Sequence, residues 1–425
     1  MAFFLAARPN QHLSLMGNLI YWNITQKNYT TNLIIMNLYQ LHLLIVFTFL
    51  VFTVLACNDE IELVEVNEYI YTGSFSGEGS KGLQVFEFDR VTGMLTEIQV
   101  VDDRAGPNFQ TIHPNGEVLY SVSDDRFDDE EPYGTISAYR IDRETGFLEL
   151  MNEQSVQGRG TAHVSVDPLG NFVYVSNYSE GNLAVYHVYD DGSLSEAVDI
   201  VQHEGSSVNP NRQRAPHVHS IIPSEDGRFI YVSDLGIDKI KIYEVDRESG
   251  ELSPASVPYF ENEPGSGPRH FTFHPNGEFA YSAEELSVTV AVLSVDPETG
   301  ALEQVQRLSL LPDGVEPDAS ISAADIHTSP DGRFLYASVR GEDLISIFSI
   351  DPETGLLDVV GHESAIGGHP RNFMVDEKGE FLLIANRDND HVVVFRRDQE
   401  TGDIEFTGIE AEVPVAVCVT QLIVE

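Results

Sequence analysis

The sequence predicts an all-β protein, a seven-bladed β-propeller made of four-stranded antiparallel blades. Three observations predict this fold. A unit of about 50 residues recurs along the chain, the units share two kinds of hairpin turn, and the last apolar segment forms a strand without a unit of its own. No long segment after residue 57 has the 3.6-residue periodicity of a helix, so a helical or two-domain fold is not expected.

The first kind of turn connects the first two strands of a unit. It contains Pro-Asn-Gly or a related sequence, in which Gly or Asn supplies the positive φ of a tight hairpin, and it runs into a strand rich in Phe and Tyr. One copy is HPNGEFAYSAE at residue 274. The six copies begin at residues 113, 167, 224, 274, 329 and 376.

The second kind of turn connects the last two strands and reads Glu-Thr-Gly-x-Leu or a close variant. Its seven copies have their glycines at 93, 146, 192, 250, 300, 355 and 402. Because there are six turns of the first kind and seven of the second, one unit is incomplete. The first unit, residues 68–101, lacks its first strand and first turn. The C-terminal segment VPVAVCVTQLIVE, residues 413–425, can supply that strand. We therefore expect it to pair with the N-terminal blade and close the ring, which leaves no unpaired sheet edge.

The composition limits the partners of this propeller. The chain has 24 Lys and Arg against 68 Asp and Glu, a formal charge of -44, which excludes nucleic acids and makes binding to anionic lipid through a basic face implausible. The 42% content of hydrophobic residues is ample for a large core. We expect a folded, strongly acidic monomer whose partner is a small molecule.

The N-terminal segment differs from the rest of the chain. Residues 1–56 contain no Asp or Glu and only two charged side chains, Arg8 and Lys27. The apolar run LLIVFTFLVFTVLAC, residues 43–57, has the length of a signal-peptide core and is short for a membrane span. Its end, VLAC, resembles a bacterial lipobox, which predicts cleavage before Cys57 and lipidation of that cysteine.

This gives three expected segments: a leader at 1–56, a short tether at 57–65 and the propeller at 66–425. The protein is then exported to the periplasm or cell envelope, and a lipid on Cys57 is its only link to a membrane. A cleaved signal without lipid and an uncleaved anchor are the alternatives. Met36 is an alternative start codon, which would place residues 1–35 outside the protein.

The repeats also indicate where polar chemistry gathers. The start of the first strand and the end of the second lie on the same face of the disc, because the two strands are antiparallel. The positions that we take as equivalent near the start of the first strand hold Asn108, Ala162, His217, Arg269, Ala324 and Arg371. Those after the second strand hold Asp124, Tyr178, Leu235, Glu285, Arg340 and Arg387.

The arginines at these positions predict a cationic pocket at one end of the central channel, suited to a small anionic ligand. The alternative is structural, because propeller arginines often bind loop carbonyls or bridge blades to acids. His217 and His219 lie two residues apart and so share one side of a strand. No third histidine or pair of carboxylates occurs at a matching offset, so neither a metal site nor a cofactor is predicted. His163 and His270 share another offset and are further candidates for substrate contact.

Four segments carry a resemblance to a known family. They are RQRAPHVHSI at 212, GPRHFTFHPNGEFAYSAEEL at 267, DIHTSPDGRFLYASVRGEDLISIFSID at 325 and GGHPRNFMVDEKGEFLLIANRDNDHVVVF at 367. Over residues 66–425 the chain resembles the lactonase propeller family, which includes propeller-type 6-phosphogluconolactonases and carboxy-muconate lactonizing enzymes. The resemblance implies an active site of one histidine, His217 or His219, with Arg269, Glu285 and Arg340. The family often has Asn where this chain has Glu284 and Val339.

The resemblance further implies hydrolysis of a sugar or aldono-lactone without a cofactor or covalent intermediate. Glu285 or His217 would activate water, while Arg269 and Arg340 would stabilise the oxyanion. Contacts to an anionic substrate would come from Arg371, Arg387, His270 and His163. Two alternatives remain at this point, a cycloisomerase that forms the lactone and a surface propeller that binds ligands without catalysis. If the enzyme is exported, its location indicates an unphosphorylated lactone as the substrate.

Fluorescence tests the predicted cleavage of the leader. Trp22 is the only tryptophan and lies in the leader, whereas the chain contains 17 tyrosines. Protein purified from the cell envelope should therefore emit as a tyrosine protein. A tryptophan emission band from that material would contradict cleavage.

Overall fold

A computed structural model of the chain describes residues 67–424, apart from 78, 102–105, 126 and 128–131, together with Leu38 and His42. The lipidation site predicted at Cys57 lies outside the described residues, as do the tether 57–65 and the leader except for those two positions. Among the described residues, no helix has the length and apolar character needed to cross a membrane.

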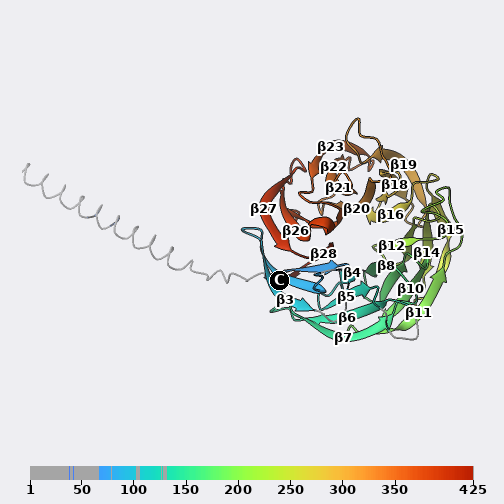
Figure 1. Ribbon diagram of the computed structural model, residues 1–425, viewed down its shortest axis with the longest axis horizontal. Coiled ribbons are helices and arrows are strands. Elements are labelled where there is room, and N and C mark those ends of the chain that lie inside the picture. The colour runs from blue at the N-terminus through green and yellow to red at the C-terminus, as the bar shows by residue number, and fades with distance from the viewer. Residues whose placement is uncertain are drawn as a thin grey trace, which may run out of the picture. The chain divides into compact units, whose positions relative to one another are not determined.

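Seven four-stranded antiparallel sheets surround a central channel, which confirms the predicted seven-bladed propeller (Figure 1). We number the blades from the sheet that contains β1. The innermost strands, in blade order, are β28 (Ala416–Val424), β4 (Pro107–Ile112), β8 (Thr161–Val166), β12 (Val218–Pro223), β16 (Pro268–Phe273), β20 (Ser322–Thr328) and β24 (Pro370–Val375). The second strands are β1 (Asn67–Ser74), β5 (Val118–Ser123), β9 (Phe172–Asn177), β13 (Phe229–Asp234), β17 (Phe279–Glu284), β21 (Phe334–Arg340) and β25 (Phe381–Asn386).

The outer half of each blade consists of a third and a fourth strand. The third strands are β2 (Leu83–Asp89), β6 (Thr135–Ile141), β10 (Asn182–Val188), β14 (Lys239–Val245), β18 (Thr289–Val295), β22 (Leu344–Ile350) and β26 (His391–Arg397). The fourth strands are β3 (Met94–Val101), β7 (Leu148–Ser155), β11 (Leu194–Gln202), β15 (Leu252–Glu261), β19 (Leu302–Ser309), β23 (Leu357–Ser364) and β27 (Ile404–Glu412). A short 3₁₀ helix, η1 (Arg387–Asn389), follows β25.

The C-terminal strand closes the ring as predicted. β28 pairs antiparallel with β1, from Asn67 opposite Val424 to Ser74 opposite Ala416. It also contacts the innermost strands β24 and β4 on its two sides. The first blade therefore combines the two ends of the propeller and leaves no gap in the ring.

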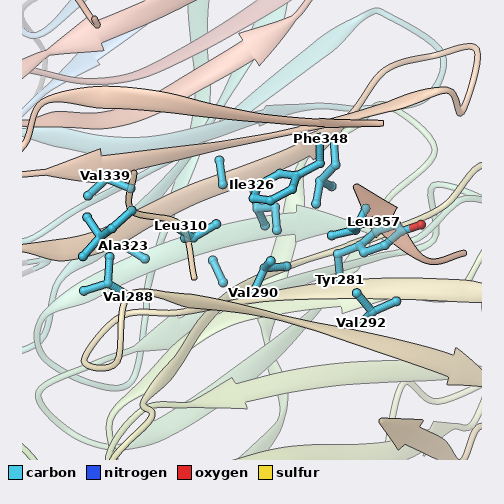
Figure 2. Packing of buried hydrophobic residues seen from close by; sticks show 14 of the residues in the cluster. Tyr281, Val288, Val290, Val292, Leu310, Ala323, Ile326, Val339, Phe348 and Leu357 are labelled. Carbon is cyan, nitrogen blue, oxygen red and sulfur yellow. The ribbon is translucent and has the colours of Figure 1, made fainter. Parts of the chain in front are cut away.

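The core lies between adjacent blades. In the cluster between the fifth and sixth blades, Tyr281, Val290 and Val292 lie opposite Ile326, Phe348 and Leu357 (Figure 2). All six are buried, with at most 2% of each residue exposed. Because each blade presents apolar side chains on both faces, it excludes water only when both of its neighbours are in place.

A recurring tyrosine connects the second turn of five blades to the blade before it. Tyr281 Oη donates a hydrogen bond to Gly355 O in the next blade at 3.1 Å. Gly355 has a φ of 69°, and a Cβ at this position would lie 2.4 Å from the Phe279 ring. Equivalent bonds run from Tyr71, Tyr120, Tyr231 and Tyr336 to Gly146, Gly192, Gly300 and Gly402. The Tyr and Gly of the repeat are therefore two halves of one contact between blades.

The third blade provides a matched test of this contact. Tyr174 is as buried as Tyr281, but its hydroxyl has no hydrogen-bond partner in the described part of the chain. We expect Tyr281→Phe to lower the free energy of unfolding by about 1 kcal/mol, because it leaves the Gly355 carbonyl unpaired. Tyr174→Phe should be neutral or stabilising, since it removes an unsatisfied polar group. Equal losses in chemical denaturation would contradict this account.

Candidate active site

A cavity of about 270 Å³ occupies one end of the central channel. It lies where the innermost strands begin and the second strands end, the face predicted from the repeats. Its lining consists of Phe75, Asp124, Gly160, Thr161, Ala162, Tyr178, Arg212, His219, Glu285, Arg340 and Arg371.

Bulges in the innermost strands direct side chains toward this cavity. In all seven blades, the pairing between the innermost and second strands skips a residue near the start of the innermost strand. A bulge bends the strand locally and re-aims the side chain of the extra residue. The skipped residues are Val417, Asn108, Ala162, His219, Arg269 and Arg371, with Ala324 and Asp325 together in β20.

The bulges correct one equivalence drawn from the sequence. Pro268 and Val218 occupy matching positions in their ladders, and the residues skipped next are Arg269 and His219. His219, rather than His217, is therefore the structural counterpart of Arg269. His217 precedes β12 and stacks on Tyr178, with ring centroids 4.4 Å apart and its Nδ1 2.9 Å from Tyr178 O.

Glu285 is the centre of the charged network. Its Oε2 lies 3.1 Å from Arg269 Nε and 3.0 Å from Arg340 Nη2, and its Oε1 lies 2.5 Å from Arg212 Nη2. Only 4% of the residue is exposed. Burial alone would raise the pKa of this carboxyl, but Arg340, Arg269 and Arg212 hold it far below its usual range. Glu285 is therefore an anion at any physiological pH.

The buried arginines are fixed by backbone carbonyls as well as by Glu285. Arg269, with 1% of the residue exposed, does not line the cavity, and its Nη1 donates to Ala324 O at 2.5 Å. Arg340 does line the cavity, and its Nη2 donates to Ala323 O at 2.7 Å. Arg269 thus positions Glu285 from behind, while Arg340 presents its guanidinium to the cavity.

Arg371 differs from these two arginines. Its guanidinium Cζ lies 4.7 Å above the Phe75 ring, a cation–π contact. Within the described part of the chain it forms no ion pair with a carboxylate. Burial, followed by the charge of Arg340, lowers its pKa to about 10, so it is still a cation at neutral pH. Three arginines, Arg212, Arg340 and Arg371, line the cavity with two carboxylates, Glu285 and Asp124, which leaves an excess of positive charge there.

His219 contributes a neutral imidazole to the lining. It is 4% exposed, and its Nδ1 has no hydrogen-bond partner among the described residues. Burial, followed by the charge of Arg269, lowers the pKa of His219 well below its ordinary value. The ring is therefore uncharged at neutral pH and carries an unpaired polar atom beside the arginines.

Three other expected site residues lie elsewhere. His270 Nδ1 lies 2.5 Å from Asp325 Oδ1, and burial followed by the charge of Arg269 lowers the pKa of His270 to about 4. His163 lines a second cavity of about 380 Å³, formed further along the innermost strands together with His327 and Asn372. Neither histidine lines the first cavity. Arg387 lies in η1, where its Nε pairs with Asp388 Oδ1 at 2.7 Å, and it does not line the cavity either.

Sequence reasoning did not identify Arg212 or Asp325. Arg212 belongs to the quoted segment RQRAPHVHSI, but it lies on the loop between β11 and β12, outside the repeated strand positions. Asp325 follows Ala324 in β20 and lies opposite Ser338, so it occupies the position that His270 has in β16. Among the described residues, no three His, Cys, Asp or Glu side chains are grouped so that they would hold a metal ion.

Comparisons with known proteins agree with this architecture. The family described as "Lactonase, 7-bladed beta-propeller" matches residues 69–421. A protein of Formosa agariphila named 6-phosphogluconolactonase is 37% identical over 73% of this chain and 87% of its own length. One of the same name from Bacillus subtilis is 34% identical over 73% of this chain and 86% of its own.

The solved structure of a periplasmic gluconolactonase from Pseudomonas aeruginosa superposes with a TM-score of 0.78 at 32% identity. That comparison covers 84% of this chain and 99% of the other. The match of the family over nearly the whole propeller, together with relatives that are more than 30% identical, gives a single assignment. The chain belongs to the lactonase family of seven-bladed β-propellers.

Proposed function

We propose that the protein hydrolyses a sugar lactone in the cavity at Glu285 and Arg340. Its general class, a carboxylic-ester hydrolase that acts on lactones, follows from the family and from the relatives named 6-phosphogluconolactonase. The observation that carries the proposal is the buried Glu285 carboxylate, which gathers three guanidinium groups at the edge of a small cavity. Such a site offers fixed positive charge where an ester carbonyl becomes an oxyanion.

The reaction requires an acceptor for a proton of the attacking water. We assign this role to His219, because its imidazole is neutral, unpaired at Nδ1 and part of the lining. Glu285 was the other candidate base. Both of its oxygens are already engaged by guanidinium groups, so neither is free to accept a proton from water. We assign it instead the task of holding the guanidinium groups in place.

The steps then follow from the chemistry of an ester. Water adds to the lactone carbonyl and gives a proton to His219, while Arg340 stabilises the resulting oxyanion. The ring C–O bond breaks, and the ring oxygen receives the proton that His219 holds. The product is a hydroxy acid, which ionises at neutral pH. The positive charge of Arg371 and Arg340 accommodates the carboxylate of the product until the product dissociates.

We also propose that the protein is exported. The apolar run at 43–57 supports export, and so does the likeness to a protein described as periplasmic. Lipidation at Cys57 belongs to the same proposal. An exported enzyme would meet lactones outside the cytoplasm, among them neutral aldono-lactones and lactones that carry a carboxylate.

The first test of this function is turnover by the purified protein. We expect it to hydrolyse gluconolactone or its 6-phosphate, and we expect Arg340→Met to lower kcat about 100-fold through loss of an oxyanion donor. Arg159→Met is the control, because Arg159 pairs with Glu180 at the surface, does not line the cavity and should leave kcat unchanged. If no lactone in a broad panel is turned over, the proposed function is wrong.

The pH dependence tests the assignment of His219. Activity requires the neutral ring of His219, and the pKa of this ring is lowered. We therefore expect kcat/KM to stay constant from neutral pH to well below about 6.5 and to decline only in more acidic solution. His219→Gln should lower kcat by about 100-fold or more and abolish this acid limb. An unchanged acid limb in that variant would assign the base to another group. His217→Gln is the matched control.

A further inference from the structure

The arginines around Glu285 differ in how firmly they are held. Arg269 and Arg340 share Oε2 of the carboxylate, are almost fully buried and also donate to backbone carbonyls. Arg212 alone contacts Oε1, and 41% of its side chain is exposed. Among the residues that the structure describes, the only other hydrogen bond from its guanidinium goes to Tyr178 Oη at 3.2 Å. If Arg212 turned away, Glu285 would keep two cationic partners.

The loop that carries Arg212 is held firmly at its base. Residues 203–217 connect β11 to β12, and Asp234 fixes both ends, with Oδ2 2.7 Å from His203 Nδ1 and Oδ1 accepting from His217 N at 2.7 Å. Asp238 fixes the middle. Its carboxylate accepts from Gln213 Nε2 at 2.7 Å and from Ser207 Oγ at 2.5 Å. The Arg212 side chain thus extends from an ordered loop.

The same aspartate connects this loop to the strand of Arg269. Asp238 is 3% exposed and also accepts from the amides of Gly265 and Gly267, at 2.6 and 2.7 Å. Gly267 immediately precedes β16. Asp238 therefore fixes the backbone of the Arg212 loop relative to the start of the Arg269 strand. The part that can still change its position is the side chain of Arg212.

We propose that Arg212 is a specificity-determining residue that exchanges its contact with Glu285 for an anionic substituent of the substrate, a phosphate or a carboxylate remote from the lactone carbonyl. This inference rests on the proposed function. A guanidinium binds either group through two parallel hydrogen bonds, the geometry that it can offer once it is released from Oε1. Arg371, which has no carboxylate partner among the described residues, supplies a second cation in the same cavity. A neutral lactone would leave Arg212 on Glu285.

The test compares three substrates: gluconolactone, its 6-phosphate, and glucarolactone, which carries a carboxylate. We expect Arg212→Gln to lower the ratio of kcat/KM for the charged lactones to kcat/KM for gluconolactone by about 10- to 100-fold, chiefly through KM for the charged lactones. A loss confined to the phosphate or to the carboxylate identifies which anion the residue serves. Arg212→Lys should recover only part of the loss, because an ammonium lacks the fork of the guanidinium.

Arg214→Gln is the matched control. Arg214 lies on the same loop, is exposed, does not line the cavity and donates from Nε to Pro210 O. It should behave as the unmodified protein does with all three substrates. Thermal unfolding of each variant establishes that the fold is retained.

A binding measurement separates this inference from the proposed function. Inorganic phosphate is the probe, and calorimetry should show weaker binding to Arg212→Gln than to the unmodified protein, by about ten-fold. Equal losses for neutral and charged lactones, or unchanged phosphate binding, would overturn the role of Arg212. Phosphate binding that depends on Arg212 in a protein that hydrolyses no lactone would overturn the proposed function and leave the anion contact standing.

Discussion

Closure of the ring is the constraint on which the rest of the structure depends. Each blade buries its faces only against two neighbours, so one unpaired blade would expose apolar surface on both sides of the gap. β28 prevents this by joining the first sheet, and charged groups reinforce the junction. Arg90 Nε and Nη2 contact Glu68 at 2.6 and 2.7 Å, and its Nη1 contacts the buried Asp376 of the last blade at 2.7 Å. Once the ring is closed, the innermost strands converge on the channel, and a bulge near the start of each re-aims a side chain. In three blades that side chain, from Ala162, His219 or Arg371, lines the cavity.

The candidate site concentrates charge that would be unfavourable elsewhere in the protein. Removing several ions from water carries a desolvation cost, and it is offset only when the geometry and hydrogen bonding are good. Here Glu285 provides the compensating charge, and the carbonyls of Ala323 and Ala324 each accept one hydrogen bond from a guanidinium group. The rigid blades hold these partners at fixed distances. A loop alone would not hold such partners at fixed distances. The loop of Arg212 is attached to the blades by hydrogen bonds to the carboxylates of Asp234 and Asp238.

The repeats made the fold predictable, because turn chemistry and strand patterning recur in every blade and the missing strand could be counted. They also placed Arg269, Glu285, Arg340 and Arg371 correctly on one face. His217 was aligned where His219 lies through a counting error of two residues, because six residues before Glu225, the turn position equivalent to Pro275, the sequence has His219. The other limits of prediction have physical causes. His163 and His270 directly follow skipped residues, so they occupy different positions from the side chains aimed at the first cavity. Arg212 lies on a loop outside the repeated strand positions. Arg387 occupies a repeated position, but its guanidinium pairs with the adjacent Asp388 and does not line the cavity.

The acidity of the chain determines how such a site acts on an anion. With a formal charge of -44, the protein as a whole repels anionic ligands, and this repulsion is screened beyond about 8 Å at physiological ionic strength. Long-range attraction therefore cannot deliver an anionic lactone to the cavity, and selectivity must arise from contacts made within it. In the proposed reaction Arg340 serves the oxyanion, and Arg269 lies behind the lining. The cations left to make those contacts are Arg371, held over Phe75, and Arg212, held at the surface end of the Glu285 cluster. Affinity for a charged lactone consequently depends on a few short-range arginine contacts, set by one bulge and one loop.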